Sequence, residues 1–274
     1  MSGIVTASPL DSQDEKLSRL DIIRSVHARF YAPDAREEGE LVALPADEAQ
    51  HLTRVLRLGR GAAVRVFNGR GAEFDATVEE TTKDEACVLL GARRASAPEP
   101  RVAVTLAQAV LKGDKMDDVV RDAVMMGAAV VQPLVTTRTE VSLATLEKAR
   151  KRERWERIAI SSAKQCGRAV VPQITEPMAF DAFMPTVAPL TLRATVLMFV
   201  EPGAASEAIP LGALDSKPSA EAMIVVGPEG GWTAEEVAAG VAACRVVTLG
   251  ERTLRADVMG VVGLAALFTM WKEF

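Results

Sequence analysis

The feature that most constrains the fold is a series of short apolar runs, separated by segments with helical spacing, after residue 101. The last three runs are apolar on both faces, which favours strands of a parallel sheet that helices cover on both sides. A chain with this pattern is expected to form an α/β domain. Its strands are predicted at 102–110 (VAVTLAQAV), 129–135 (AVVQPLV), 194–200 (ATVLMFV), 222–227 (AMIVVG) and 245–250 (RVVTLG).

The first two of these strands are each followed by a helical pattern. The segment DKMDDVVRDAVMMG has apolar residues at helical spacing, with Asp114 as its expected N-cap and Gly127 as its expected end. Residues 143–166 predict one long, charged, amphipathic helix, most of whose charges lie on a solvated face. These helices are the first elements expected to cover the sheet.

Two further helices are predicted nearer the C-terminus. Thr233 and Glu236 have the spacing of a capping box, which marks a helix start. The last pattern, roughly 257–271, is apolar nearly all round. Such a helix is typically buried, either in a core or in a subunit interface.

A different pattern precedes the stretch Ala92 to Arg101, which holds two prolines and no periodicity and therefore predicts a domain boundary. Before it, short alternating runs are separated by Asn-Gly, a hairpin signal, so a small β-barrel of about 70 residues is expected. The segment ADEAQHLTRVLRL predicts a short helix. We place the domains at 26–97 and 98–274, and we expect the polar, acidic residues 1–25 to be a disordered leader.

Net charge argues against a globally basic nucleic-acid binder, because the chain of 274 residues carries a formal charge of −5. Locally the balance is reversed, since residues 51–71 contain five arginines and no acidic residue. This segment is a candidate phosphate-contact face, and a solvated barrel surface is an equally good interpretation. The arginines are Arg54, Arg57, Arg60, Arg65 and Arg70.

The histidine and cysteine content offers no metal site. The three cysteines are far apart and there are only two histidines, so neither a zinc pattern nor a disulfide framework is expected. The N-terminus lacks the pattern of a signal peptide, and the longest apolar run, Val258 to Met270, is too short to span a bilayer. We therefore expect a cytoplasmic protein that binds no metal and no membrane.

Two glycine-punctuated segments follow predicted strands, where ligands bind in open α/β sheets. In GPEGG, Gly230 and Gly231 can adopt positive φ and allow a ligand to approach the backbone, although a plain tight turn has the same appearance. The spacing is not that of a dinucleotide-binding loop. In LGERTLRAD, Arg255 and Asp257 are candidate site residues. The alternatives are a solvated loop and a helix cap at Asp257.

Taken in order, six segments resemble the RsmE family of small-subunit ribosomal RNA uridine N3-methyltransferases, in the SPOUT superfamily. The resemblance extends from about Arg29 to the C-terminus. Each segment is a weak signal alone, and their order is specific. They are HLTRVLRLGRG, FNGRGAEFDATV, LKGDKMDDVVRDAVMMG, RWERIAISSAKQCGRAVVPQI, VVGPEGGWTAEEV and LGERTLRAD.

The resemblance implies a PUA-like barrel that binds RNA and a SPOUT domain with a deep trefoil knot at about 195–260. It implies S-adenosylmethionine as cofactor, 16S ribosomal RNA in the small ribosomal subunit as partner, and a homodimer. Arg255 and Asp257 are the implied catalytic residues. The implied cofactor-binding residues are Val200, Glu201, Pro202, Gly227, Pro228, Glu229, Gly230, Gly231, Leu249, Gly250 and Leu254, and the implied RNA-binding residues are Arg29, His51, Arg54, Arg57, Arg138, Gln165 and Arg168.

The sequence departs from the family pattern after Arg255. The family commonly has Thr-Glu-Thr where this chain has Ala256, Asp257 and Val258, so both hydroxyls are missing and the carboxylate is one methylene shorter. We favour an active methyltransferase for N3 of a uridine, acting on the assembled subunit. The alternatives are a paralogue that binds RNA or the ribosome without catalysis, and a methyltransferase for a different RNA target.

Overall fold

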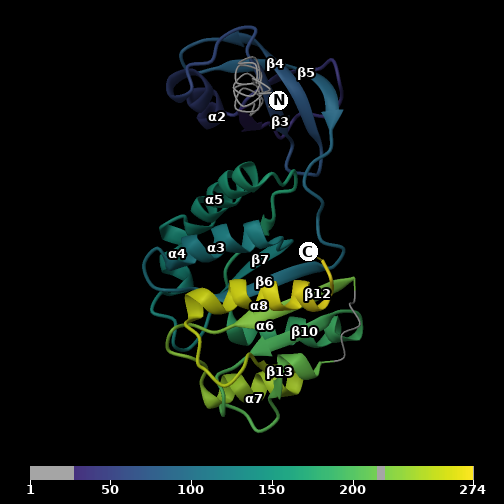
Figure 1. Cartoon of the computed structure of the whole chain (residues 1–274). Coiled ribbons are helices and arrows are strands. Elements are labelled where there is room, and N and C mark those ends of the chain that lie inside the picture. Colours follow the sequence, from purple (N-terminus) through teal and green to yellow (C-terminus); the bar gives the residue numbers. More distant parts are fainter. Residues whose placement is uncertain (1–27, 215–219, 274) are drawn as a thin grey trace, which may run out of the picture. The chain divides into compact units, whose positions relative to one another are not determined.

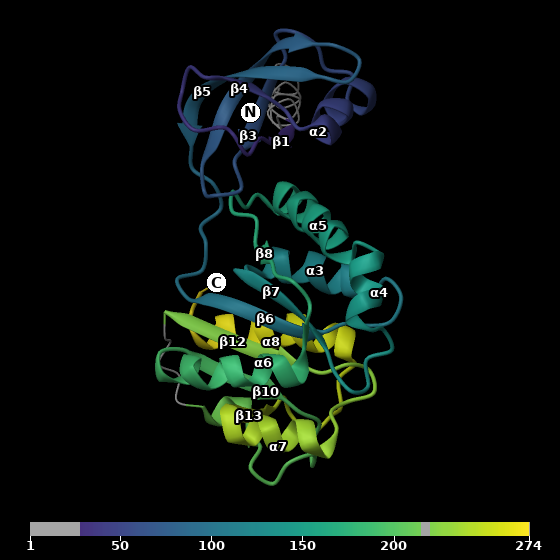
Figure 2. The same cartoon turned by 180° about the vertical axis from the view of Figure 1, so that it is seen from behind.

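The computed structural model describes residues 28–214 and 220–273. The chain divides into two compact units between Ala95 and Ser96, inside the stretch that the sequence marks as a boundary. Figures 1 and 2 show the two units from opposite sides. The leader predicted at 1–25 lies outside the described residues.

The N-terminal unit is built on a five-stranded sheet of order β1-β3-β4-β5-β2. The pairs β3–β4, β4–β5 and β5–β2 are antiparallel and the pair β1–β3 is parallel. The core contains an apolar cluster that includes Phe30, Val66, Phe74, Val78 and Leu90. The elements are β1 (Arg29–Tyr31), β2 (Leu41–Ala43), α2 (Ala46–Gln50), the π-helical turn η1 (His51–Val55), β3 (Ala63–Phe67), β4 (Glu73–Thr81) and β5 (Ala86–Arg94).

The Asn-Gly segment connects β3 to β4, as the hairpin signal predicts. The Asn68 side chain accepts hydrogen bonds from the backbone amides of Arg70 and Ala72, at 2.8 and 3.1 Å. Gly69 and Gly71 both have positive φ, which a side chain would disfavour. The short helix predicted from ADEAQHLTRVLRL is present as α2 and η1.

The C-terminal unit is an eight-stranded sheet in which every pairing is parallel. Its order is β11-β13-β10-β12-β6-β7-β8, with β9 also beside β7. The five predicted strands are confirmed as β6 (Ala103–Ala109), β7 (Val130–Val135), β10 (Thr195–Phe199), β12 (Glu221–Val226) and β13 (Arg245–Thr248). Sequence pattern missed the two-residue strands β8 (Gln173–Ile174), β9 (Met178–Ala179) and β11 (Ile209–Pro210).

Helices cover both faces of this sheet, as the parallel arrangement requires. Helices α3, α5 and α8 pack on one face, and α6 and α7 pack on the other (Figures 1 and 2). The elements are α3 (Lys115–Met126), α4 (Leu143–Lys148), α5 (Lys151–Cys166), α6 (Phe180–Val187), η2 (Ala188–Leu192), η3 (Leu211–Ala213), α7 (Ala234–Ala243) and α8 (Ala256–Met270).

The capping predictions have mixed outcomes. Thr233 and Glu236 form the predicted capping box, and Gly127 ends α3 with a φ of 100°. Asp114 is at the N-cap of α3, but its side chain makes no capping hydrogen bond. The N-cap of α8 is Arg255, so the alternative reading of Asp257 as a cap is wrong.

The single helix predicted over 143–166 is wrong, because the segment forms α4 and α5. Ser142 caps α4 by accepting a hydrogen bond from the Thr145 amide at 3.2 Å. Arg150 then adopts a left-handed conformation with a φ of 49°, which ends one helix and begins the next. Charged residues continue across the break, so the amphipathic pattern does not reveal it.

Helix α8 packs closely against the sheet at two glycines. A Cβ atom at Gly263 would lie 3.2 Å from the Phe199 ring, and one at Gly260 would lie 3.1 Å from the Gln108 side chain. The buried side chains of α8 confirm the predicted burial for one face, whereas Val258 on another face is 39% exposed. No helix among the described residues is long and apolar enough to cross a membrane.

Candidate functional site

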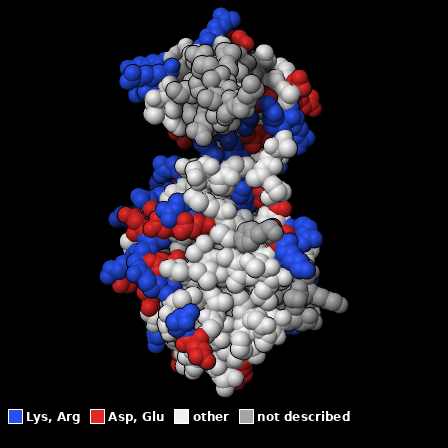
Figure 3. All heavy atoms as spheres, viewed as in Figure 1, with Lys and Arg blue, Asp and Glu red and all other residues white. Residues whose placement is uncertain are grey.

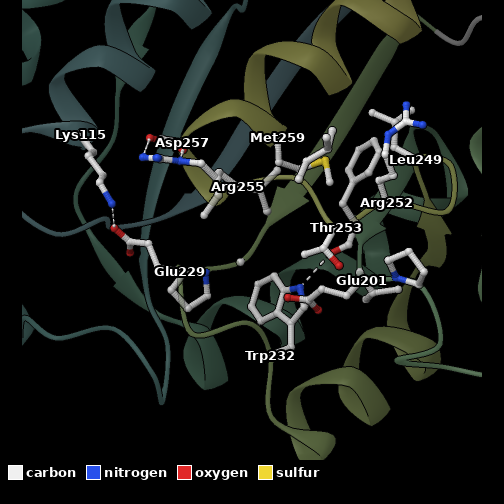
Figure 4. Close-up of a pocket in the computed structure, with 18 residues that line it drawn as sticks. Lys115, Glu201, Glu229, Trp232, Leu249, Arg252, Thr253, Arg255, Asp257 and Met259 are labelled. Carbon is white, nitrogen blue, oxygen red and sulfur yellow. Dashed lines mark hydrogen bonds and ion pairs between the residues drawn. The ribbon is translucent and has the colours of Figure 1, made fainter.

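Three loops, each following a parallel strand, enclose a cavity of about 430 Å³ (Figure 4). They follow β10, β12 and β13, which are neighbours in the sheet, so their carboxyl ends meet at one edge. Ten of the thirteen predicted cofactor and catalytic residues line this cavity: Val200, Glu201, Pro202, Gly227, Pro228, Glu229, Leu249, Leu254, Arg255 and Asp257. The sequence thus identified a set of residues that the fold brings together.

The GPEGG loop is shaped by close contacts at its glycines. Gly231 has a φ of 67°, and a Cβ atom there would lie 2.6 Å from a carboxylate oxygen of Glu201. A Cβ atom at Gly227 would lie 2.9 Å from the Trp232 indole, whose Nε1 donates to the Phe199 carbonyl at 2.8 Å. One wall of the cavity therefore depends on the absence of side chains.

Of the two glycines that can adopt positive φ in the Gly-Gly pair, Gly231 does so and Gly230 does not. Gly230 instead lies against Arg138, whose guanidinium donates to the Gly230 carbonyl at 2.7 Å. Gly230, Gly231 and Gly250 belong to the site loops but are not among the residues that line the cavity.

At the opposite end of the cavity, charged side chains are paired with one another, and we call this the charged end (Figure 4). Glu229 accepts two hydrogen bonds on one carboxylate oxygen, from Lys115 Nζ at 3.0 Å and from the Lys112 amide at 3.2 Å. Arg255 and Asp257 form a bidentate pair, with Nε to Oδ1 at 3.0 Å and Nη2 to Oδ2 at 2.6 Å. Two cations and two carboxylates therefore lie at this end.

Both carboxylates are held in their ionised form. The hydrogen bond from Arg255 is the main cause that lowers the pKa of Asp257. Partial burial acts to raise the pKa of Glu229, but hydrogen bonds from Lys115 and from backbone amides outweigh it, so the net pKa is lowered. Carboxylates with lowered pKa are weak proton acceptors, and these two can hold the neighbouring cations in a fixed orientation.

Sequence reasoning missed several residues that line the cavity, of which Lys115 and Trp232 are the most informative. Lys115 follows the carboxyl end of β6, the strand beside β12, so the strand-end rule that found the other loops also applies to it. Trp232 directly follows GPEGG in the sequence. The other missed residues are Phe199, Val226, Arg252, Thr253, Ala256 and Met259.

Arg168 does not lie where an RNA contact needs it, and this prediction is corrected. Its side chain is 6% exposed, and it donates to Glu99 through Nε at 3.0 Å. It also donates to the carbonyls of Val124 and Ala128, at 2.7 and 3.1 Å. Arg168 thus joins the start of the C-terminal unit to the end of α3 and has a structural role.

The other predicted RNA-binding residues differ in their surroundings. Arg29 is held by Glu73 at 2.8 Å and lies over the Phe67 ring, so it is largely committed to the N-terminal unit. His51 packs edge-on against Phe30. The exposed residues of the set are Arg54, Arg57, Arg138 and Gln165.

The local arginine excess of residues 51–71 is reduced by acidic partners from β4 and from the loop after it. Arg60 pairs with Glu79 at 3.7 Å, Arg65 approaches Asp75 at 3.6 Å, and Arg54 pairs with Asp84. Figure 3 shows Lys, Arg and acidic side chains together on this unit. The charge of this face is therefore more mixed than the sequence segment alone indicates.

Comparisons with known proteins agree with this geometry. The family profile described as "RNA methyltransferase domain" matches residues 98–268, and "RNA methyltransferase PUA domain" matches 44–90. The chain is 32% identical over 228 residues to a Synechocystis protein named Ribosomal RNA small subunit methyltransferase E, covering 82% of this chain and 72% of the relative. A Bacillus subtilis protein of the same name is 26% identical, covering 84% of this chain and 91% of the relative.

Solved structures are similar over nearly the whole chain. A Ribosomal RNA small subunit methyltransferase E from Neisseria gonorrhoeae, bound to S-adenosyl methionine, has a TM-score of 0.79 and 29% identity, covering 89% of this chain and 98% of that one. A methyltransferase from Legionella pneumophila with bound cofactor SAM has a TM-score of 0.80 and 27% identity, covering 89% and 97%.

Proposed function

Because the chain belongs to the small-subunit ribosomal RNA methyltransferase E family, we propose that it methylates N3 of a uridine in small-subunit ribosomal RNA. It is an S-adenosylmethionine-dependent methyltransferase. The observation that carries the proposal is one cavity that has a wall of glycine backbone and apolar side chains beside Glu201, and an end where two cations and two carboxylates are paired. The first suits a nucleoside-sized cofactor, and the second suits a base that must lose a proton.

The residues present fit S-adenosylmethionine. A cavity of about 430 Å³ is in the range of small-molecule sites, and its apolar lining includes Phe199, Trp232 and Leu249. Backbone groups beside Gly227 and Leu249 offer donors and acceptors for the edges of an adenine. When bound, the cofactor supplies a methyl group on a positively charged sulfur, which is already an activated donor.

The chain's own task is to prepare the base. Uracil N3 carries a proton, and when that proton leaves, negative charge spreads over N3 and the two carbonyl oxygens. A cation beside the base stabilises this charge, and Arg255 is positioned at the charged end of the cavity. Asp257 holds the Arg255 guanidinium in one orientation through two hydrogen bonds. We therefore assign Asp257 a positioning role.

The missing hydroxyls of the Ala-Asp-Val segment have unequal consequences. Ala256 lines the cavity, so a hydroxyl is absent there, whereas Val258 is 39% exposed and is not among the lining residues. The shorter Asp257 still reaches Arg255 with both oxygens. This retained pair supports an active enzyme over a non-catalytic paralogue.

RNA contacts are proposed at the exposed members of the predicted set. Arg54 and Arg57 lie on the N-terminal unit, and Arg138 lies beside the GPEGG loop, where its guanidinium contacts the Gly230 carbonyl. Arginine contacts to phosphate fix the position of a nucleic acid without reading its sequence. Reversal of charge at Arg54 and Arg57 should weaken binding and reduce its salt dependence.

We also propose a homodimer, a trefoil knot at about 195–260 and a cytoplasmic location. For the dimer, Figure 3 shows mainly uncharged surface over α8, and Val258 on that helix is exposed. For the knot, β13 pairs with β10 rather than with β12, the strand that precedes it in the chain. Free cysteines and a ribosomal RNA substrate support the location.

The test is methyl transfer from labelled S-adenosylmethionine to small ribosomal subunits that lack this modification, with the product nucleoside identified. The proposal predicts N3-methyluridine. No transfer, with cofactor binding confirmed by calorimetry, would favour a paralogue without catalysis on this RNA. A different methylated nucleoside would assign a different target.

A further inference from the structure

Among the described residues, the cavity lining comes from the ends of β10 and β12, the three strand-end loops and the start of α8, with one exception. The exception is Lys115, the first residue of α3. It lies at the charged end, near Glu229, Arg255 and Asp257 (Figure 4). The start of α3, outside the three loops and α8, thus contributes a cation to the site.

The position of Lys115 is set by Glu229. One oxygen of that carboxylate accepts from Lys115 Nζ at 3.0 Å and from the Lys112 amide at 3.2 Å. Gly113, between the two donors, has a φ of 66°, which permits the sharp turn. The loop between β6 and α3 is therefore attached to the GPEGG loop through Glu229.

We propose that Lys115 is a catalytic residue whose ammonium contacts a carbonyl oxygen of the target uracil and stabilises the charge formed when N3 loses its proton. This inference rests on the proposed function. Uracil has a carbonyl on each side of N3, and the charged end offers two cations, Lys115 and Arg255. One cation for each carbonyl matches the way the negative charge is distributed.

Lys115 can contact the base without leaving Glu229. An ammonium has three donors on a flexible stem, and the hydrogen bond to Glu229 occupies one of them. The Lys115 side chain is 38% exposed, so its remaining donors are accessible to a base entering the cavity. Glu229 acts as a positioning residue for this cation.

The reaction balances without another reactant. N3 gives its proton to water, and its electron pair forms the bond to the methyl carbon. The bond between that carbon and sulfur breaks with its pair remaining on sulfur, which becomes a neutral thioether. The Lys115 ammonium takes no part in this proton transfer, so its contribution is electrostatic.

The main test compares Lys115→Met with Lys112→Met in single-turnover methyl transfer to unmodified small subunits. Lys112→Met is the matched control, because it removes the same charge three residues earlier in the chain, and the Lys112 side chain pairs with Glu140 and does not line the cavity. We expect Lys115→Met to slow transfer by about 100-fold or more at saturating RNA and cofactor. Its calorimetric affinity for S-adenosylmethionine should stay within about twofold of that of the unaltered protein, and Lys112→Met should retain the rate.

A pH profile separates catalysis from a structural role. A cation beside the base lowers the pKa of N3–H, so the rate of the unaltered protein should reach its plateau at lower pH than that of Lys115→Met. RNA that carries 5-fluorouridine at the target, with its more acidic N3–H, should recover part of the lost rate.

Equal rates for the two variants would overturn the inference, as would a loss of rate matched by an equal loss of cofactor affinity. An unshifted pH profile would also overturn it. If the unaltered protein transfers no methyl group to small subunits, the proposed function itself fails and the inference fails with it.

Discussion

The two ends of the cavity achieve binding by different means. At one end glycine backbone and apolar side chains form the walls together with Glu201 and Arg252, and a Cβ atom at Gly231 would lie 2.6 Å from a Glu201 oxygen. At the other end, Lys115, Glu229, Arg255 and Asp257 form two ion pairs. The first end is sensitive to shape, and the second is sensitive to charge.

This difference bears on the departure from the family pattern. Of the segment Ala256 to Val258, Asp257 lies at the charged end and reaches Arg255 with both carboxylate oxygens, whereas Val258 does not line the cavity. No residue of the GPEGG loop differs from the pattern that the family resemblance rests on. Substitutions should therefore affect cofactor affinity at one end and the rate of transfer at the other.

The largest effect is expected for Arg255→Ala. Removal of a cation that stabilises charge only during the reaction should lower the transfer rate by about 100–1,000-fold. The S-adenosylmethionine affinity, measured by calorimetry, should change much less. Arg252→Ala is the matched control for the rate, since Arg252 lines the cavity from the same loop but lies away from Lys115, Glu229 and Asp257 (Figure 4). Equal losses of rate and affinity in Arg255→Ala would make it a binding residue.

For Gly231→Ala we expect a loss of cofactor affinity that is larger than the loss of transfer rate. Its positive φ and the approach to Glu201 should lower cofactor affinity by about 10–100-fold, because each strained residue costs about 1–3 kcal/mol. Gly203→Ala controls for backbone strain alone, since Gly203 has a φ of 83° and a Cβ atom there meets nothing within 4 Å. If both variants lose affinity equally, the contact with Glu201 does not shape the site.

Arg168→Met should change neither the cofactor affinity at one end of the cavity nor the transfer rate at the other. It leaves Glu99 and two buried carbonyls without their donor, so the free energy of unfolding should fall by about 1–3 kcal/mol, measured by urea denaturation. RNA affinity of the folded variant should be retained below its unfolding temperature. A variant of full stability with weakened RNA binding would restore Arg168 to the RNA-binding set.

The smallest effect concerns the titration of Asp257. Its pKa is lowered by Arg255, so the pair is complete above the ordinary carboxyl range and is lost only as pH falls through the lowered pKa. Arg255→Met should move the Asp257 pKa upward, which carboxyl NMR can follow. An unchanged value would mean that the ion pair does not persist in solution.

Prediction from sequence succeeded where a residue acts on neighbours only a few positions away in the chain. Asn68, Gly127 and the pair Thr233–Glu236 act as their residue types indicate, and the strand-end rule located the cavity. It failed where the environment of a side chain depends on a residue far away in the sequence. The sequence predicts that Arg168 is an exposed cation in a loop, but in the structure its guanidinium is paired with Glu99.

The break at Arg150 shows a second limit. Charged residues with helical spacing run through it, and only the left-handed backbone of Arg150 divides the two helices. Lys115 shows a third limit, because the helical spacing of its segment predicts a helix and gives no sign that its side chain lines a cavity. Residues from several elements meet only once the sheet order is known.

We propose that one end of the cavity binds the cofactor and that the other end carries out the chemistry. The most direct test is a crystal structure of the protein with S-adenosylmethionine. We expect the adenine against the loops that hold Trp232 and Leu249, with the sulfonium methyl directed at the space between Lys115 and Arg255. A methyl group directed toward Glu201, with the adenine among the four charged side chains, would contradict the claim.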